Sequence, residues 1–547
     1  MRRLTLPTAL LPLLVSASAL LYLGYSLHYG FVGFPLDDAW IHQTYARNLG
    51  QHRQLAYNLG EPSVGSTSPL WTAILAPAYA LHLEPRLWTY LLGALFLALT
   101  AWLLHRLSRR LSPRSGLVPL LTVAFCLLEW HLAWAAFSGM ETILFVFLSL
   151  LVLERHLPGE RPLLTGLAGG LLALTRPEGV VLLLIIAADT VWRPPQGASR
   201  PRWWSLGTSA ILLVGFLLPV VPYLALNMSI TGNPFPNTFY AKQAEYQEVV
   251  ASLPVWARLA RVTFVTVVGA QALLIPGFLY AAYKGARDRS RPILLFLAWW
   301  AALITIYALR LPVTYQHGRY LMPAIPLLVL LGVWGTENLP RLHRIPKRAL
   351  LLSLPILLFI FWVRGAQQYA TDVRIIDSEL KAAGLWIRDN TPGSAIIGAH
   401  DIGAIGYFSE RSLIDTAGLI TPEVIPFIRS EERILAFLEE KDVDYVAIFP
   451  SWYPTLASDT RLRTVYRSTN PWIVEAGGDN IVVYETAWSE ARRFSTTGAR
   501  HGWCVSVNSV HPGLHRQRFN DILVVHDGQN PLLSHGVRPP WSTRSES

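Results

Sequence analysis

Long apolar runs are the feature that most constrains this chain. Runs of about 15 to 22 mostly apolar residues, each about the length that crosses a bilayer as a helix, recur throughout residues 4–364. Only 15% of the residues are charged, whereas a soluble chain would have about a quarter. The sequence therefore predicts an α-helical polytopic membrane protein.

The charges between the runs give them an orientation. Lys and Arg gather in the short loops between apolar runs, and the positive-inside rule places such loops on the inner side of the membrane. The formal net charge of +10 is explained by these loops, without nucleic-acid binding. The basic loops lie at residues 106–114, 155–161, 193–202, 284–291 and 341–348.

Together with a first helix within residues 4–29, the apolar runs predict about 11 spans. Ala17-Ser18-Ala19 has the form of a signal-peptide cleavage site, but the apolar region is longer than the usual h-region of about 7–15 residues, so we expect a retained helix. The later spans are expected at residues 87–105, 117–134, 140–154, 162–175, 178–192, 204–226, 263–283, 292–310, 319–336 and 349–364.

Residues 70–83 are short for a span, and they follow Ser68-Pro69, a typical helix start. We expect this helix to lie flat on the membrane surface, because a span here would put the basic loop at 106–114 outside. Residues 1–364 then form the transmembrane domain, with residues 31–86 as its first outer loop. Everything after residue 364 lies on the outer side.

Residues 365–487 change character and predict a small extracytoplasmic α/β domain. Helices are expected at 378–389 and 431–441, with strands at 394–399, 412–415 and 445–449. Residues 488–547 are rich in Ser, Arg, His, Gly and Pro and predict a mostly disordered tail.

Two adjacent carboxylates, Asp37 and Asp38, open a helix expected at 39–49 just after the first span. Asp is a good N-cap, and its charge suits a helix N-terminus. Capping explains one of the two residues and leaves the other for function. A carboxylate at a membrane boundary is costly, and here it could accept a proton from an incoming hydroxyl as a general base.

Three further charges mark the ends of predicted spans. Glu141 begins a span on the outer side, where it could simply complement the helix N-terminus. Arg176 and Glu178 join two unusually short spans, and such charges either line a hollow at membrane depth or pair with each other to hold the turn. We take Glu141 and Glu178 as candidate substrate-binding residues and Arg176 as a candidate phosphate ligand.

Two outer loops add cations and a phenol. Lys242 ends a loop made rigid by two prolines and could pair with an anion or reach lipid headgroups. His317 and Arg319 lie at the outer mouth of a span, where Arg could grip a phosphate through a bidentate fork or anchor a headgroup. All three are candidate phosphate ligands, and Tyr320 beside them is a candidate substrate-binding residue.

Cofactor signals are weak. The two cysteines, Cys126 and Cys504, form neither a disulfide framework nor a thiolate metal site. Beyond the Asp pair no carboxylate cluster points to a divalent ion, so the sequence favours metal independence. No Gly-rich nucleotide-binding fingerprint precedes a helix, which makes a nucleotide-sugar donor unexpected.

Taken together, these motifs resemble the polytopic GT-C glycosyltransferases. The resemblance rests on DDAWIHQTYARNLG, SGMET, LTRPEG, NPFPNTFYAK and HGRYLMPAIP, in this order within residues 1–364, and on DTAGLITPE at residues 415–423. It is greatest for the arabinofuranosyltransferase-like branch, and protein mannosyltransferases and aminoarabinose transferases are more distant relatives.

The resemblance implies inverting transfer of a sugar, such as the pentofuranose arabinofuranose, from a polyprenyl-phosphate carrier. The acceptor would be an extracytoplasmic glycan, lipid or protein at a bacterial cell membrane. Asp37 maps to the family's catalytic base, with Asp38 beside it, while Arg176, Lys242 and Arg319 map to its phosphate-binding cations. A transporter or flippase of a polyprenyl-linked lipid, or an assembly subunit, stays open as an alternative.

Overall fold

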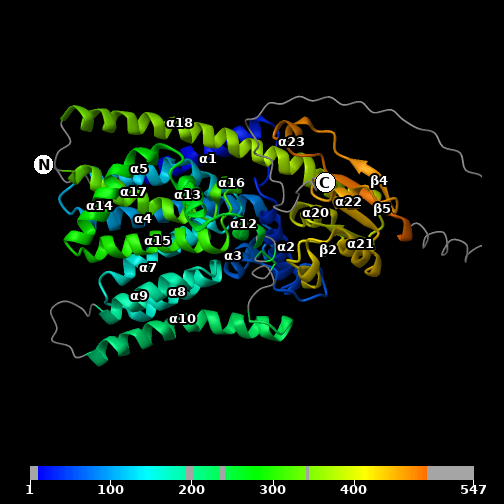
Figure 1. Ribbon diagram of the computed structural model, residues 1–547, viewed down its shortest axis with the longest axis horizontal. Helices are drawn as coiled ribbons and strands as arrows, with labels where there is room; N and C mark the ends of the chain where they lie inside the picture. The colour runs from blue at the N-terminus through cyan, green and yellow to red at the C-terminus, as the bar shows by residue number, and fades with distance from the viewer. Residues whose placement is uncertain are drawn as a thin grey trace, which may run out of the picture.

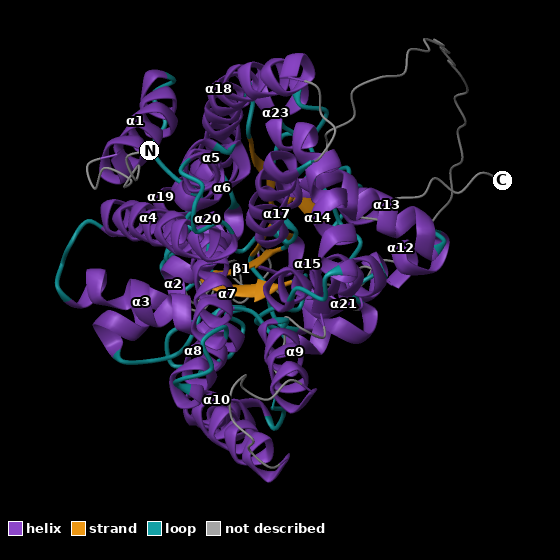
Figure 2. Cartoon of the chain, turned by 90° about the vertical axis from the view of Figure 1, so that its left-hand side faces the viewer, coloured by secondary structure: helices purple, strands orange, loops and turns teal. Residues whose placement is uncertain are grey.

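The computed structural model describes residues 10–192, 202–234, 241–242, 244, 247–339 and 344–489. A bundle of roughly parallel helices is covered at one end by a smaller domain that contains a β-sheet (Figure 1). Figure 2, viewed from the opposite end of the bundle, shows the strands behind the helices. We call these parts the helix bundle and the sheet domain. Most of the proline-containing loop and the tail after residue 489, with Cys504, lie outside the described residues.

Most helices of the bundle follow the apolar runs. Their bounds are α1 Leu10–His28, α2 Asp37–His52, α3 Pro69–Ala80, α4 Pro85–Leu111, α5 Leu117–Leu128, α6 Trp130–Phe137, α7 Thr142–His156, α8 Pro162–Thr175, α9 Gly179–Trp192, α10 Arg202–Thr231, α12 Gln247–Ser252, α13 Val255–Thr266, α14 Ile275–Arg287, α15 Arg291–Arg310, α16 Tyr315–Gly318, α17 Ile325–Asn338 and α18 Arg344–Ile376. Short 3₁₀ segments, Ala270–Leu274 and Met322–Ala324, precede α14 and α17.

Among the described residues, five helices are long and apolar enough to cross a membrane, or up to seven if each of two bent pairs counts as one span. The chain is therefore an integral membrane protein, as expected, whereas the count of 11 spans stays a prediction. Helices α8 and α9, with 14 residues each, are as short as the sequence suggested. Helix α3, with 12 residues, rises only about 18 Å and matches the short helix expected there.

Two of the expected spans are broken. Helices α5 and α6 meet at 50°, and α13 meets the segment containing α14 at 107°. At the first break Glu129 leaves the helix and its carboxylate accepts a hydrogen bond from the amide of Leu132 at 3.0 Å, so it caps α6. At the second, Gly269 has a φ of 144°, a backbone conformation that hydropathy does not reveal.

Ion pairs link the basic loops at the end of the bundle away from the sheet domain. Arg106 at the end of α4 pairs with Glu154 at the end of α7 at 2.6 Å. Asp189 near the end of α9 pairs with His156 at 2.8 Å and with Arg291, the first residue of α15, at 2.7 Å. Four helix ends that the charge pattern assigns to one side of the membrane thus meet at one end of the bundle.

The sheet domain follows α18 through a π-helical turn, Asp377–Lys381. Its helices are α19 Ala382–Asn390, α20 Gly403–Ser409, α21 Glu431–Glu440, α22 Pro454–Ala457 and α23 Pro471–Glu475, with a 3₁₀ segment Pro422–Phe427. Its strands are β1 Ile396–Ala399, β2 Ser412–Asp415, β3 Tyr445–Ile448, β4 Leu462–Arg467 and β5 Val482–Thr486. The strands expected at 394–399, 412–415 and 445–449 contain β1, β2 and β3, whereas β4 and β5 were not predicted.

The sheet has the order β2-β1-β3-β5-β4, and its first three strands are parallel. Because β2 and β3 lie on opposite sides of β1, the order of the strands reverses at β1. Open α/β sheets usually bind ligands at such a point, at the carboxyl ends of their strands. That edge faces the bundle. Gly403, four residues after β1, contacts Asp37, and a side chain at Gly65 would lie 2.7 Å from the carbonyl oxygen of Leu419 after β2.

Candidate active site

The two adjacent carboxylates point into different surroundings. Leu36, and not an aspartate, is the extended N-cap of α2, so Asp37 and Asp38 occupy the first turn of the helix. The Asp37 carboxylate accepts hydrogen bonds from the amides of Gly403 and Ala404, both at 2.7 Å, and so binds the sheet domain. Asp38 instead forms an ion pair with Arg319 of the bundle.

The opposite surroundings give the two carboxylates opposite proton affinities. Burial raises the pKa of Asp37 to about 7, although the amides of Ala404 and Gly403 lower it. For Asp38 burial also raises the pKa, but the charges of Arg319 and Lys242 outweigh it and hold the pKa well below its usual range. Asp37 is therefore poised to exchange a proton near neutral pH, while Asp38 stays ionised.

Tyr320 gathers three cations around its ring. Its hydroxyl accepts a hydrogen bond from Arg319 Nη2 at 2.9 Å and from Lys242 Nζ at 2.7 Å. The guanidinium carbons of Arg176 and Arg319 lie 4.8 and 4.9 Å from its ring centre, within cation–π range. One phenol thus holds cations from three separate segments together beside Asp38.

A strained turn presents Arg319. The three residues before it, Gln316, His317 and Gly318, have φ values of 52°, 57° and 65°. Left-handed backbone is costly for residues other than glycine and persists where the surrounding structure enforces it, often at functional sites. The strain therefore marks the turn that fixes the guanidinium of Arg319.

His317 anchors that turn rather than joining the cation cluster. Its Nε2 lies 2.7 Å from a carboxylate oxygen of Asp372 in α18. Its ring packs edge-on against Trp130 and Trp134 of α6, with centroids 5.4 and 5.1 Å away. The described contacts of His317 thus lead to α6 and α18 and not to the cation cluster.

The turn between α8 and α9 supplies the second guanidinium. Arg176 Nε lies 2.8 Å from Glu178 and 3.9 Å from Glu141, and Arg176 Nη2 donates to the hydroxyl of Tyr307 at 2.8 Å. Tyr307 in α15 donates in turn to Glu178. Two acids and a phenol thus hold Arg176, which is almost fully buried.

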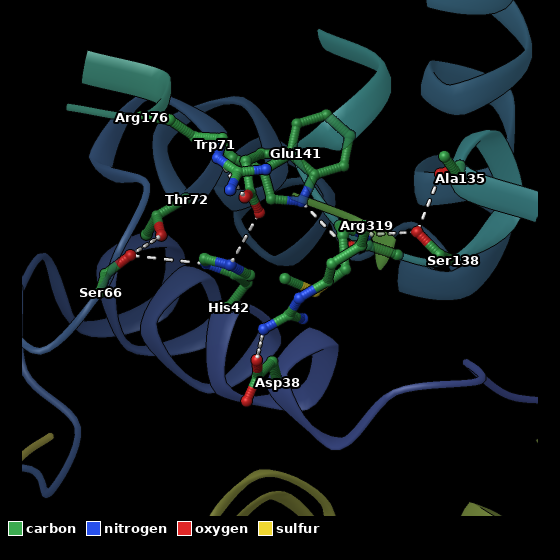
Figure 3. Close-up of polar contacts among 12 residues, drawn as sticks. Asp38, His42, Ser66, Trp71, Thr72, Ala135, Ser138, Glu141, Arg176 and Arg319 are labelled. Atoms are coloured by element: carbon green, nitrogen blue, oxygen red, sulfur yellow. Dashed lines mark hydrogen bonds and ion pairs between the residues drawn. The ribbon is translucent and has the colours of Figure 1, made fainter. Parts of the chain in front are cut away.

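His42 connects this group to α2, as Figure 3 shows. It lies one helical turn after Asp38, and its Nε2 is 3.4 Å from Glu141. Ser66, from the loop before α3, lies 3.5 Å from the other ring nitrogen of His42. In the same view the guanidinium of Arg319 reaches down to Asp38, and Arg176 lies above Glu141.

Each guanidinium keeps one nitrogen free. Nη1 of Arg176 and Nη1 of Arg319 are buried and have no hydrogen-bond partner among the described residues. A buried donor without an acceptor costs about 1–3 kcal/mol, so such an atom calls for an explanation. The arrangement can therefore accept oxygen atoms of an anion through two guanidinium groups.

The structure brings most of the sequence-derived candidates together. Asp38, Glu141, Arg176, Glu178, Lys242, Arg319 and Tyr320 form one contact network, and Asp37 adjoins it on α2. Among the described residues, no group of three or more His, Cys, Asp or Glu side chains is arranged to hold a metal ion.

Sequence reasoning missed three contributors. His42 had a signal, since it follows Asp38 by four residues and so shares its helix face. Tyr307 lies within an apolar run, and no feature of the sequence marked it as a site residue. The amides of Gly403 and Ala404 are backbone groups, which no side-chain motif can reveal.

Comparisons with known proteins agree with this architecture. Residues 363–507 match a family described as a domain of unknown function (DUF8728), a region that includes the sheet domain. No curated protein matches the sequence.

Solved structures show the fold over most of the chain. ArnT from Cupriavidus metallidurans in the apo state is similar with a TM-score of 0.58 and 15% identity, over 88% of this chain and 98% of that one. ArnT bound to undecaprenyl phosphate gives 0.57 and 15%, over 87% and 98%. The archaeal oligosaccharyltransferase AglB from Archaeoglobus fulgidus, in complex with an inhibitory peptide and a dolichol-phosphate, gives 0.53 and 13%, over 81% and 69%. The chain therefore has the GT-C fold, which confirms the fold expected from its motifs, whereas the arabinofuranosyltransferase branch stays a prediction.

Replacing Glu178 by Met tests the energetics of the buried pair. Loss of one partner from a buried ion pair costs up to about 3–5 kcal/mol. Here Arg176 would lose its nearest counter-charge and keep only the more distant Glu141, at 3.9 Å. We expect a loss of this size in the free energy of unfolding, measured by circular dichroism in a detergent titration. Asp288→Asn is the control, because its 2.6 Å pair with Lys284 is exposed and should contribute little. Equal losses in the two variants would contradict the proposed network.

Proposed function

We propose that this protein is an inverting glycosyltransferase that uses a polyprenyl-phosphate sugar as donor. One observation carries the proposal. Two buried guanidinium groups, those of Arg176 and Arg319, pack on the ring of Tyr320, and each has a donor with no partner among the described residues. Arg319 also pairs with Asp38, whose proton affinity is opposite to that of its neighbour Asp37. The GT-C fold supports the proposal, and so do the names of two similar structures, which contain undecaprenyl phosphate and dolichol-phosphate.

The donor phosphate is assigned to the cation cluster. Arg319 and Arg176 offer their Nη1 donors, which have no partner within the described part of the chain, and Lys242 adds a third charge. Guanidinium groups suit phosphate because their donors match two oxygens at once. As the sugar–phosphate bond breaks, negative charge grows on the phosphate, and these preorganised cations stabilise it. Tyr320 holds the cluster together.

The remaining candidates serve the donor site indirectly. Glu141 and Glu178 orient Arg176, as their contacts with its guanidinium suggest. His317 keeps the strained turn in place and so aims Arg319 at the phosphate.

Asp37 is assigned the role of base. The acceptor hydroxyl oxygen attacks the anomeric carbon, its proton passes to Asp37, and the bond from that carbon to the phosphate oxygen breaks. Polyprenyl phosphate leaves with the bonding electrons, so a single displacement inverts the anomeric centre. A pKa of about 7 suits proton transfer near neutral pH. Each Asp37 oxygen accepts one amide hydrogen bond, and a carboxylate oxygen has room for a second.

The acceptor is assigned to the junction of the two domains. A cleft of about 440 Å³ opens there between α2, α3, α19 and α20. Phenols and cations suit a ligand rich in hydroxyl groups. The cleft is lined in part by Arg47, Tyr79 and His82 of the bundle and by Arg388, Tyr407 and Phe408 of the sheet domain.

The finer assignments follow the sequence resemblance. We propose a pentofuranose such as arabinofuranose as the sugar, and an extracytoplasmic glycan, lipid or protein as the acceptor. We also propose that the sheet domain and the active site face the outer side of a bacterial cell membrane. The distribution of Lys and Arg between loops supports this orientation.

Replacing each aspartate by asparagine distinguishes the roles of Asp37 and Asp38. Asp37→Asn keeps the size of the side chain and removes the proton acceptor, so we expect transfer to fall about 10²–10⁴-fold. Asp38→Asn should do less damage, because Asp38 is proposed to position Arg319. Transfer is measured as release of free undecaprenyl phosphate from carriers bearing arabinofuranose, mannose or aminoarabinose, with donor binding as the folding control.

Reversed effects would exchange the roles of the two aspartates. Normal transfer by both variants would contradict the glycosyltransferase mechanism. Translocation of the intact lipid across vesicles without release of carrier phosphate would instead support the flippase alternative.

Arg319→Lys separates the geometry of the cation from its charge. Lys keeps the charge but presents a point donor in place of the planar fork, so turnover should fall while the protein still folds. Arg289→Lys is the matched control, because Arg289 is exposed in the loop before α15. Equal release of undecaprenyl phosphate by Arg319→Lys and the wild type would show that the bidentate geometry of the Arg319 guanidinium does not contribute to turnover.

Cysteine labelling tests the orientation. In a variant without Cys126 and Cys504, single cysteines replace Arg114, Arg289 or Glu440, which are all exposed. An impermeant thiol reagent added to intact cells should label position 440 of the sheet domain. Positions 114 and 289 should react only after the membrane is permeabilised. The reverse pattern would place the sheet domain inside.

A further inference from the structure

The sheet domain meets the helix bundle through the start of α20. Gly403 and Ala404, its first two residues, bind the Asp37 carboxylate through their amides. In Figure 1, α20 and α2 lie next to each other at the junction of the two domains. Asp37 is thus bound by backbone atoms of a domain that begins more than three hundred residues later in the chain.

The narrow space between Gly403 and Asp37 requires a glycine at position 403. A Cβ atom built on Gly403 would overlap the backbone carbonyl of Asp37 and lie 2.7 Å from the carbon of its carboxylate. Only a residue without a side chain allows the two backbones to approach this closely. Any larger residue must push the amides away from the carboxylate.

The domain does not need this contact in order to dock. Asn58, in the loop after α2, exchanges two hydrogen bonds of 3.0 Å with the backbone of Leu413 in β2. Arg47 of α2 donates to the carbonyl oxygen of Tyr407 at 3.1 Å, and Tyr57 donates to that of Ile402. Since these bonds already join the domains, the paired amides on Asp37 call for a different explanation.

We propose that the sheet domain positions the catalytic base, with the amides of Gly403 and Ala404 fixing the orientation of the Asp37 carboxylate toward the acceptor hydroxyl. Gly403 and Ala404 are then positioning residues that act through Asp37. This inference rests on the proposed function, and it assigns a role to the region that matches a family of unknown function.

The amides constrain Asp37 in two ways. One hydrogen bond to each oxygen fixes the carboxylate plane, so the remaining lone pairs keep one direction. The amides also favour the charged form of Asp37 and so lower its pKa, whereas burial disfavours the charged form and raises the pKa. Among the described residues, the charges of Asp38 from α2 and Tyr57 from the following loop interact with this carboxylate, and His400 of the sheet domain faces Asp38.

Gly403→Ala in the full-length protein tests the proposal. Misplacement of a catalytic group by about 1 Å can cost about 10²-fold in rate, so we expect kcat to fall by that order while KM for the donor stays unchanged. The acidic limb of the kcat/KM profile should move to higher pH, because the buried carboxylate loses two donors. Gly393→Ala in the same domain is the control, because its Cβ would meet no atom within 4 Å.

Hydrogen–deuterium exchange separates positioning from docking. In Gly403→Ala, peptides covering residues 412–415 should stay protected, because the bonds to Asn58 persist. In Asp37→Ala, peptides covering residues 403–406 should exchange faster than in wild type, and this result requires no enzymatic activity. Unchanged exchange of residues 403–406 would overturn the contact itself.

The activity outcomes distinguish the two proposals. If the wild type releases undecaprenyl phosphate and Gly403→Ala matches its kcat, or its acidic limb is unmoved or lies at lower pH, positioning is overturned and the glycosyltransferase proposal stands. If the wild type releases none from any of the three sugar carriers, the proposed function fails and this inference fails with it.

Discussion

Buried charge must be compensated, and this constraint organises the end of the helix bundle. Arg176, Arg319 and Glu141 are each no more than 5% exposed. Unpaired ions in such surroundings would cost several kcal/mol each. Glu178 and Asp38 supply the counter-charges, and Tyr307 and Tyr320 each accept one further hydrogen bond from a guanidinium group. The network therefore fixes where α2, α7, α8, α15 and the turn before α17 meet. Nη1 of Arg176 and Nη1 of Arg319 have no partner among the described residues, so a ligand must supply hydrogen-bond acceptors for them.

Much of this arrangement could be predicted from the sequence, because hydropathy and charge act locally. Apolar runs gave the helices, and the basic loops gave four helix ends that the structure joins by ion pairs. Ionisable residues at membrane depth are rare and expensive, so Asp38, Glu141, Arg176 and Arg319 on the less basic side of the predicted spans stood out. The breaks at Glu129 and Gly269 were not predictable in the same way, since they depend on a cap and on a backbone angle.

The division of labour between Asp37 and Asp38 could not be read from the sequence. As neighbours on one helix they are chemically identical, and the difference arises from distant segments. Arg319, two hundred and eighty-one residues away, keeps Asp38 ionised, whereas burial against Gly403 and Ala404 raises the proton affinity of Asp37. The strained turn that aims Arg319 was equally hidden, because left-handed backbone at Gln316 and His317 follows from packing and not from local preference.

The amides of Gly403 and Ala404 can fix the Asp37 carboxylate only if the sheet domain has a fixed position relative to the helix bundle. Helix α18 runs for 33 residues and continues through the π-helical turn into α19, so no flexible linker separates bundle and sheet. Within that turn Glu379 is fully buried and accepts hydrogen bonds from the amide of Ile481 and the hydroxyl of Ser468, both at 2.9 Å. This carboxylate fastens the sheet to the end of the long helix. The same helix also carries Asp372, which holds His317 and the turn before Arg319. One rigid element therefore sets the position of the sheet-domain amides that bind Asp37 and of the guanidinium that binds Asp38.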